Sequence, residues 1–144
     1  MSSSQADPEG RVLGLDLGDA RIGVAISDAE RKLAVPLGTV ATGAPQDLKA
    51  IRKLVTENDV TAVVVGHPIS MSGARGPRAA HAEEFAGALR EFLKIPVELH
   101  DERLSTVEAD RALREAGASG RQRKRAVDRS AAAVILQAWL DRHR

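Results

Sequence analysis

Residues 12–28, VLGLDLGDARIGVAISD, contain two apolar runs separated by a short polar turn. The first run covers 12–16, the turn contains Gly18-Asp19-Ala20, and the second run covers 21–28. Apolar runs that flank a short turn containing Gly and Asp predict a β-hairpin. This hairpin decides the fold, because the later elements have to be arranged around the sheet that it begins.

The next segments predict a third strand, a helix and a buried strand. The apolar stretch 33–40 contains Pro36, which favours a strand at the edge of a sheet. Residues 47–57 have apolar side chains at helical spacing, with Asn58 as the expected stop. Residues 61–66, TAVVVG, form a continuous β-branched run that is typical of a central strand covered on both faces.

The second half of the chain predicts three helices and one strand. We expect a helix over 78–94 with Pro77 in its first turn, and a strand over 96–103. Ser105 and Glu108 match a capping box, which predicts a helix from there to Gly117. A last helix is expected from about 121–124 to Asp141, with a buried stripe made of Val127, Ala131, Val134, Ile135 and Ala138.

This order of elements predicts an α/β fold. An antiparallel meander of three strands joined to right-handed crossover units gives a mixed five-stranded sheet with helices on both faces. A chain of 144 residues has room for a single core. We therefore expect one domain over 11–144, preceded by a disordered tail over 1–10, MSSSQADPEG.

The composition excludes some classes of function. The chain has no cysteine, which excludes disulfides and zinc sites built on thiolates. Phe85, Phe92 and Trp139 are its three aromatic residues, which disfavours binding of single strands by stacking of bases. The net charge is +1, so a nucleic-acid interface would have to rest on local patches. No apolar run approaches the roughly 18 residues of a membrane span and the start does not resemble a signal peptide, so we expect a cytoplasmic protein.

Four acidic residues are candidates for chemistry. Asp16 lies inside an apolar strand, where an ionised carboxylate needs a cation or several donors; a set of amide hydrogen bonds from the next turn is the alternative. Asp101 and Glu102 follow the last strand, and at most one of these two neighbours is expected to join Asp16 directly. Asp128 lies at the border of the last helix's stripe, four residues after Lys124, where a helix salt bridge is the alternative.

Acids on the first strand, the last strand and the final helix are expected to meet at one end of the sheet. Hard divalent cations such as Mg²⁺ or Mn²⁺ prefer oxygen ligands of this kind. Asp16, Glu102 and Asp128 are therefore the predicted metal ligands, with Asp101 and Lys124 as further catalytic candidates. The four histidines have no metal-ligand spacing, although His67 and His100 end strands and would border the cleft.

Two basic segments are candidates for phosphate binding. The loop 66–77 is rich in Gly and Ser and contains Arg75, with Arg78 directly after it; a plain flexible connection is the alternative. Residues 121–129, RQRKRAVDR, have five basic residues and one acidic residue, and include Arg121, Arg123 and Arg125. Such a run is often solvated surface, but here it adjoins Asp128. Arg103 is a further candidate, or pairs with Asp101 or Glu102 at the surface.

Four blocks of the sequence together resemble the YqgF family, also called RuvX. They are GLDLGDARIGVAISD at 14–28, VVGHPISMSGARGPRA at 64–79, HDERLST at 100–106 and KRAVDRSAAAVILQAWLD at 124–141. The resemblance spans about residues 11–141. It implies an RNase H-like fold of the RuvC type and a cytoplasmic nuclease that matures the precursor of the small-subunit (16S) ribosomal RNA or resolves Holliday junctions. Asp16, Asp101 or Glu102, and Asp128 match the acids of the family's motifs.

One departure from the resolvase pattern keeps other functions open. The resemblance implies a fourth acid one turn from Asp128, where this chain has Ala131 and Ala132. The leading hypothesis is a metal-dependent endonuclease that acts on structured RNA or branched DNA, as a homodimer if junctions are cut symmetrically. A non-catalytic nucleic-acid or ribosome-assembly module is the second. An actin-like phosphotransferase is the third, and is disfavoured because the chain is too short for a second lobe.

Overall fold

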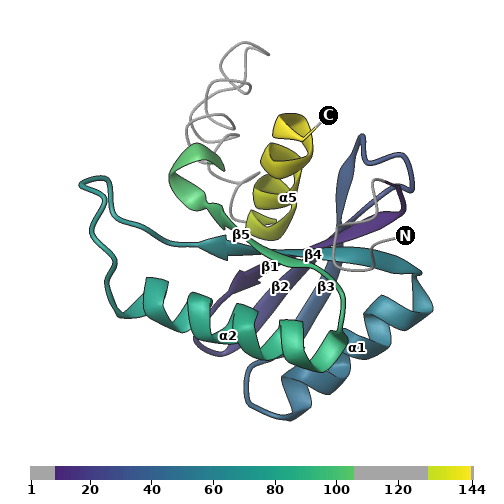
Figure 1. Cartoon of the computed structure of the whole chain (residues 1–144), viewed down its shortest axis with the longest axis horizontal. Coiled ribbons are helices and arrows are strands. Elements are labelled where there is room, and N and C mark those ends of the chain that lie inside the picture. Colours follow the sequence, from purple (N-terminus) through teal and green to yellow (C-terminus); the bar gives the residue numbers. More distant parts are fainter. Residues whose placement is uncertain (1–8, 106–129, 144) are drawn as a thin grey trace.

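The computed structural model describes residues 9–105 and 130–143, and its centre is a mixed five-stranded sheet (Figure 1). The strands lie in the order β3-β2-β1-β4-β5. Their bounds are β1 Arg11–Leu17, β2 Arg21–Ser27, β3 Ala34–Ala41, β4 Val60–His67 and β5 Val97–Asp101. β1, β2 and β3 pair antiparallel, whereas β4 and β5 run parallel to β1. The predicted hairpin, its turn and the central position of β4 are confirmed.

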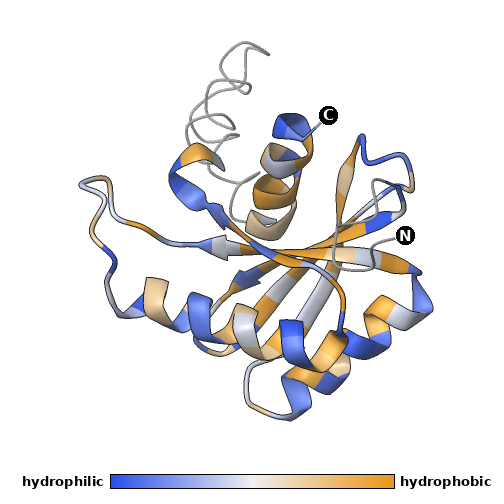
Figure 2. Cartoon of the chain, in the orientation of Figure 1, coloured by the Kyte–Doolittle hydropathy of each residue, from blue (hydrophilic) through white to orange (hydrophobic). Residues whose placement is uncertain are grey.

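Helices cover both faces of the sheet, as predicted. Helices α1 (Gln46–Glu57) and α2 (Pro77–Leu93) pack on one face around Leu13, Val63 and Leu89. Helix α5 (Ala131–Arg142) packs on the other face against Val12, Ala62 and Val64. Figure 2 shows the largely apolar strands with helices on either side that carry both apolar and hydrophilic residues. This arrangement makes the strands two-sided core elements, which explains the continuous apolar run in β4.

Local sequence signals set several of the boundaries. Pro36 lies in the edge strand β3, where its missing N–H removes no hydrogen bond from the centre of the sheet. Pro77 is the first residue of α2, and Lys94 ends that helix with a left-handed backbone (φ 61°). Asn58 caps the end of α1 with its backbone N–H on Leu54 O. Across the described residues, no helix is both long and apolar enough to cross a membrane.

Two boundaries differ from the prediction by more than one residue. Strand β5 ends at Asp101, and residues 102–105 are helical, so the strand does not reach residue 103 and helical structure precedes the capping box at Ser105. Helix α5 begins at Ala131, where the prediction had 121–124, because the Ser130 hydroxyl accepts the N–H of Ala133 at 3.1 Å and caps the helix there. The expected end at Gly117 lies outside the described residues.

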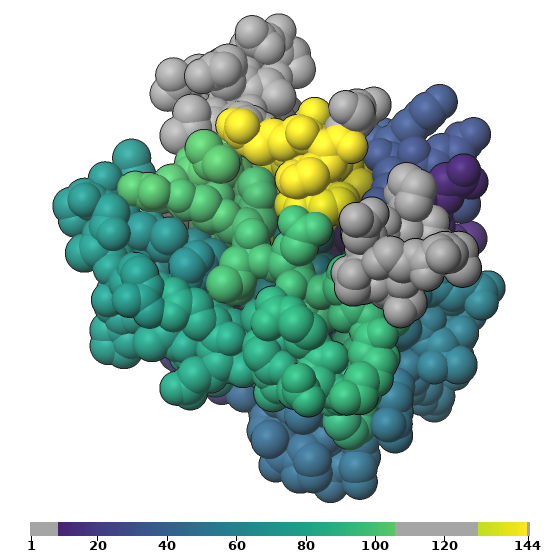
Figure 3. All heavy atoms as spheres, viewed as in Figure 1, coloured from purple at the N-terminus to yellow at the C-terminus, as the bar shows by residue number. Residues whose placement is uncertain are grey.

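The buried face of α5 also differs from the predicted stripe. Of the predicted stripe, Ile135 and Ala138 are buried, Ala131 and Val134 are half-buried, and Val127 lies outside the described residues. The other buried residues of α5 are Ala132, Leu136, Trp139 and Leu140. Residues 131–140, AAAVILQAWL, are apolar nearly all round, so periodicity selects no face. The close approach of Leu136 to Gly14 orients the helix instead, since a Cβ on Gly14 would lie 2.7 Å from that side chain. Figure 3 shows α5 seated beside the segment that ends at residue 105.

Residues 1–8 lie outside the described part, so the disordered tail over 1–10 stays a prediction. Gly10 donates its N–H to Ala29 O at 3.1 Å and accepts from Arg31 Nε at 2.8 Å. These bonds hold the entry of β1 against the end of the hairpin.

Candidate active site

The carboxyl ends of β1, β4 and β5 bring two acidic side chains together. Asp16 comes from the end of β1, and Glu102 follows the last residue of β5. Because these three strands are parallel, their carboxyl ends meet at one edge of the sheet, where α/β proteins bind ligands. Gly66 of β4 lies between them, and a Cβ there would lie 2.7 Å from Glu102 Oε2 and 2.8 Å from Ile135 Cδ1. A glycine at this point gives Glu102 the space to lie over β4.

Both carboxyl groups are half-buried and repel each other. Burial raises the pKa of Asp16, and the charge of Arg78 opposes that rise. Burial and then the charge of Asp16 raise the pKa of Glu102, against the charges of Arg78 and His67. Two carboxylates that resist ionisation in this way favour a bound cation, because a cation compensates both their desolvation and their repulsion.

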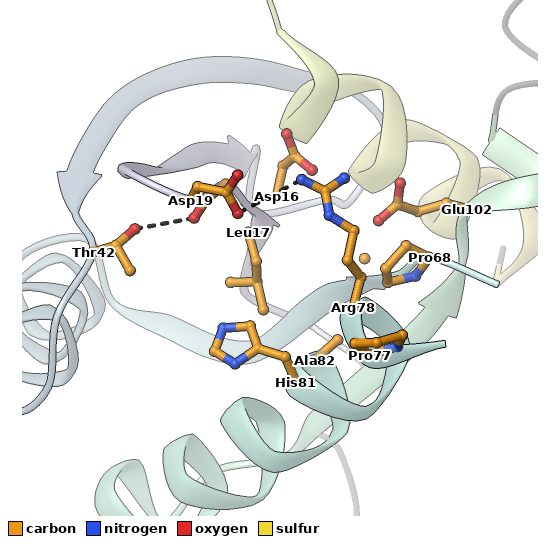
Figure 4. A pocket seen from close by; sticks show the side chains of 12 residues that line it. Asp16, Leu17, Asp19, Thr42, Pro68, Pro77, Arg78, His81, Ala82 and Glu102 are labelled. Carbon is orange, nitrogen blue, oxygen red and sulfur yellow. Dashed lines mark hydrogen bonds and ion pairs between the residues drawn. The ribbon is translucent and has the colours of Figure 1, made fainter. Parts of the chain in front are cut away.

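Asp16 and Glu102 line a pocket of about 390 Å³. Its other walls are the turn after β1 with Asp19, residue Thr42 after β3, and the start of α2 with Arg78 and His81. Figure 4 shows the guanidinium group of Arg78 between the carboxyl groups of Asp16 and Glu102, with an ion pair to Asp19. The Thr42 hydroxyl donates to Gly18 O at 3.2 Å and ties two of these walls together.

Asp101 and Arg103 pair with each other beside this pocket. Arg103 Nη2 lies 2.6 Å from Asp101 Oδ2, and its Nε lies 3.0 Å from Oδ1. These hydrogen bonds hold the pKa of the Asp101 carboxyl below its ordinary value. Of the two neighbouring acids, Glu102 therefore lies beside Asp16. Asp101 forms an ion pair with Arg103 instead, which is the alternative that the sequence offered.

Arg75 is likewise paired with an acidic side chain, that of Glu83. Its Nε donates to Glu83 Oε2 at 2.7 Å, and its Nη2 bonds the other carboxylate oxygen. His67 Nε2 lies 2.7 Å from Glu83 Oε2, so one carboxylate joins the end of β4, the loop and α2. The hydrogen bonds from Arg75 and then from His67 lower the pKa of Glu83 to about 2. This cluster fixes the loop over 68–76 against the helix that follows it.

The remaining predicted site residues lie outside the described part of the chain. These are Asp128, Lys124, Arg121, Arg123 and Arg125. Within residues 9–105 and 130–143, no three acidic or histidine side chains come close enough together to hold a metal ion. The described site is thus a pair of acids with one arginine.

Comparison with known proteins identifies the family. The model of the RuvX family, described as Holliday junction resolvase, matches residues 10–142. The chain belongs to the RuvX family. A relative from Chloroflexus aggregans is 46% identical over 137 residues, which cover 94% of this chain and 96% of the relative. Another from Anaeromyxobacter dehalogenans is 48% identical over 133 residues, covering 92% and 97%. Both are named "Putative pre-16S rRNA nuclease".

Solved structures confirm the fold that the RuvX resemblance implied. RuvC from Thermus thermophilus in complex with a Holliday junction substrate has a TM-score of 0.52, with 14% identity over 90% of this chain and 91% of RuvC. A second structure of the same RuvC has a TM-score of 0.53, with 16% identity over 89% and 92%. The mixed sheet with helices on both faces is therefore the RNase H-like fold of RuvC.

Three features of this RuvX-family site were not found by sequence reasoning. Asp19 was predicted only as part of a turn, and Glu83 carries no signal beyond its place on a helix. His81 had a usable signal, since it lies three residues after Arg78 and hence on the same face of α2. Of the histidines predicted to border the cleft, His67 lies beside Glu102 and His100 is buried.

Proposed function

We propose that the chain is a metal-dependent endonuclease that hydrolyses phosphodiester bonds in structured nucleic acid. The observation that carries this proposal is the pair of half-buried acids, Asp16 and Glu102, which face each other across an open pocket at the carboxyl end of the sheet. A pocket that concentrates negative charge does not by itself attract a phosphodiester. It becomes suited to one when a cation neutralises the acids.

The donor set fits Mg²⁺ or Mn²⁺. Carboxylate oxygens are the ligands that hard divalent cations prefer, and the mutual repulsion of the two acids would be relieved by such an ion. Asp16 and Glu102 would hold the ion, with Asp128 as the third acid that the family motif supplies. When bound, the metal supplies charge stabilisation at the attacked phosphate and lowers the pKa of water. The chain itself contributes the rigid strand ends that orient the acids and the Arg78 guanidinium, which is suited to a phosphate oxygen.

The substrate proposal follows the relatives. We infer that the precursor of the small-subunit ribosomal RNA is the natural substrate, because relatives 46% and 48% identical are named for a nuclease of pre-16S rRNA. Holliday junctions are the second proposed substrate, because the family model is described as Holliday junction resolvase. We propose a cytoplasmic location for the protein. Arg121, Arg123 and Arg125, with Lys124, are proposed to contact backbone phosphates next to Asp128. Symmetric cutting of a junction would require two copies of the chain, and we propose a homodimer for that reaction.

Cleavage assays on both substrates test the proposal. A labelled precursor RNA fragment and a four-way DNA junction are incubated with Mg²⁺, with Mn²⁺ and with a chelator. Asp16→Asn and Glu102→Gln should each lower the cleavage rate by about a hundredfold or more, since losing a metal ligand removes several kcal/mol of transition-state stabilisation. Glu57→Gln, an exposed acid of α1, is the matched control. Unchanged cleavage by Asp16→Asn would exclude a catalytic role for that residue.

A binding module without catalysis is the second candidate. It is favoured by Ala131 and Ala132, which stand where the resolvase pattern has a fourth acid. Ala132 is buried against the sheet, with its Cβ 3.7 Å from the position of a Cβ on Gly23, and neither alanine has a side-chain oxygen that could bind a metal. Tight binding of both substrates without cleavage in any metal would support this candidate over the endonuclease.

A further inference from the structure

Three arginines of the described site were predicted to bind phosphate, and they differ in how firmly they are held. Arg75 and Arg103 each engage both oxygens of a carboxylate, on Glu83 and Asp101. Arg78 makes a single ion pair, 3.7 Å from Nη2 to Asp19 Oδ1, and both side chains are exposed, at 73% and 98%. An exposed pair of this kind contributes about 0–1 kcal/mol. Arg78 can therefore leave its partner at little cost, whereas the other two arginines cannot.

The backbone of Arg78 is fixed at the point where its charge acts on both acids. It follows Pro77, the first residue of α2, and its side chain lines the pocket that contains Asp16 and Glu102. It also lines a neighbouring groove of about 520 Å³ between the 68–77 loop and Arg103. Figure 4 shows its guanidinium group between the carboxyl groups of Asp16 and Glu102. Arg78 thus lines both the pocket with the two acids and the groove beside it.

We propose that Arg78 is an exchangeable counter-ion: it neutralises Asp16 and Glu102 before metal binding, and turns to a substrate phosphate once a divalent cation has taken its place. The inference rests on the proposed function, since it needs a metal and a nucleic acid at this site. Two cations beside the same carboxylates repel each other, so the arrival of the metal weakens the attraction that holds Arg78 inward. A guanidinium released in this way matches the geometry of a phosphate group.

This exchange couples the binding of metal to the binding of nucleic acid. Arg78 competes with the metal for the acids, and the phosphate competes with the acids for Arg78. Each ligand therefore favours the other, and the coupling must be equal in both directions. A fixed phosphate-binding arginine would give no such coupling, because its contact with the substrate would form with or without the metal.

Metal affinity is the first measurement. Mn²⁺ binding to the full chain, without nucleic acid, is followed by electron paramagnetic resonance and titration calorimetry. Arg78→Gln should bind Mn²⁺ roughly five- to tenfold more tightly, because a positive charge is removed from the pocket that would hold the metal. Arg78→Lys keeps the charge and should stay close to the wild type. Lys53→Gln, which removes an exposed positive charge on α1, is the matched control and should change nothing.

Nucleic-acid affinity with and without metal is the second measurement. A four-way DNA junction and a precursor RNA fragment are titrated in a chelator and in Ca²⁺, which takes the same oxygen ligands. Arg78→Gln should leave the affinity nearly unchanged in the chelator. In Ca²⁺ it should weaken binding and lower the slope of log K against log salt by about 0.9 on duplex arms, the value for one lost phosphate contact.

Two results would overturn the inference. One is unchanged or weaker Mn²⁺ binding by Arg78→Gln; the other is an equal loss of nucleic-acid affinity in chelator and in Ca²⁺, which would make Arg78 a permanent phosphate contact. Because Arg78 is exposed, its variants should fold, and melting curves check this.

Both measurements are independent of cleavage, so an inactive protein would refute the endonuclease while leaving the counter-ion exchange testable. An active one without coupling would refute only the exchange.

Discussion

Asp16 is held in the folded chain at an energetic cost. Its pKa is raised chiefly by burial, so the folded state binds a proton more readily than the unfolded chain does. Above the ordinary carboxyl pKa, the ionised group therefore destabilises the fold. Residues placed for function commonly carry such a cost.

Asp16→Asn should accordingly raise the melting temperature at pH 7 in a chelator, although it lowers the cleavage rate. Asp101→Asn is the contrasting variant: the bonds from Arg103 lower the pKa of that carboxyl, so its loss should lower the melting temperature. Calorimetry of the two variants and the wild type checks both signs. A lower melting temperature for Asp16→Asn would show that its carboxylate is a structural hydrogen-bond acceptor instead.

Glu83 predicts a pH dependence of stability. Its pKa is lowered from the usual 4.5 to about 2, first by the hydrogen bond from Arg75 and then by that from His67. A depressed folded pKa adds stability above pH 4.5, and this contribution is lost as the pH falls from 4.5 to about 2. The difference in melting temperature between the wild type and Glu83→Gln should therefore shrink across that window. A difference that does not change with pH would contradict the ion pairs, and Arg75→Gln should remove most of it.

At the scale of elements, the contact between β4 and the segment after β5 depends on Gly66. An alanine there would bring a Cβ to 2.7 Å from Glu102 and 2.8 Å from Ile135. We expect Gly66→Ala to cost about 1–3 kcal/mol of unfolding free energy, the usual effect of overpacking, and to reduce cleavage by displacing Glu102. Denaturant unfolding and the cleavage assay measure the two effects.

Gly87→Ala is the control for this prediction. Gly87 lies inside α2, and an added Cβ meets nothing within 4 Å. The substitution should therefore stabilise the protein by about 0.5–1 kcal/mol through helix propensity. If Gly66→Ala were as stable and active as Gly87→Ala, the tight contact at Glu102 would not position the acid.

The same elements show what could be predicted from the sequence and what could not. The hairpin, β4 and α2 have strong local signals, namely a short turn, a continuous β-branched run and a proline at the first helical residue, and all three were predicted. The start and the buried face of α5 were not, because its sequence is apolar nearly all round and Gly14 on a distant strand selects the face. The end of β5 was missed because Asp101 and Glu102 look alike locally, although one ends a strand and the other begins a helical segment.

The whole molecule resolves the charge balance that first disfavoured nucleic acid. The net charge of +1 is a sum over many acidic and basic residues, and at the site these form ion pairs. The pairs are Arg75 with Glu83, Arg103 with Asp101, and Arg78 with Asp19. The sequence predicted Asp16 as a site residue because it is an acid inside an apolar strand, and Asp101 or Glu102 because both follow the last strand. It offered the pairing of Arg103 with Asp101 as an alternative, but not the pairings of Arg75 with Glu83 and of Arg78 with Asp19, because the fold brings those residues together. Under the proposed function, a divalent cation bound by Asp16 and Glu102 would add positive charge at this edge of the sheet.

A divalent cation should consequently stabilise the whole domain. A ligand that binds only the folded state adds about 2.7 kcal/mol at a hundredfold excess over its Kd. For a chain of 144 residues this corresponds to a rise in melting temperature of roughly 5–10 °C. Calorimetry at increasing Mg²⁺ should show this rise for the wild type and a much smaller one for Asp16→Asn and Glu102→Gln. An equal rise in all three proteins would mean that the ion binds elsewhere, and that these two carboxylates do not hold it.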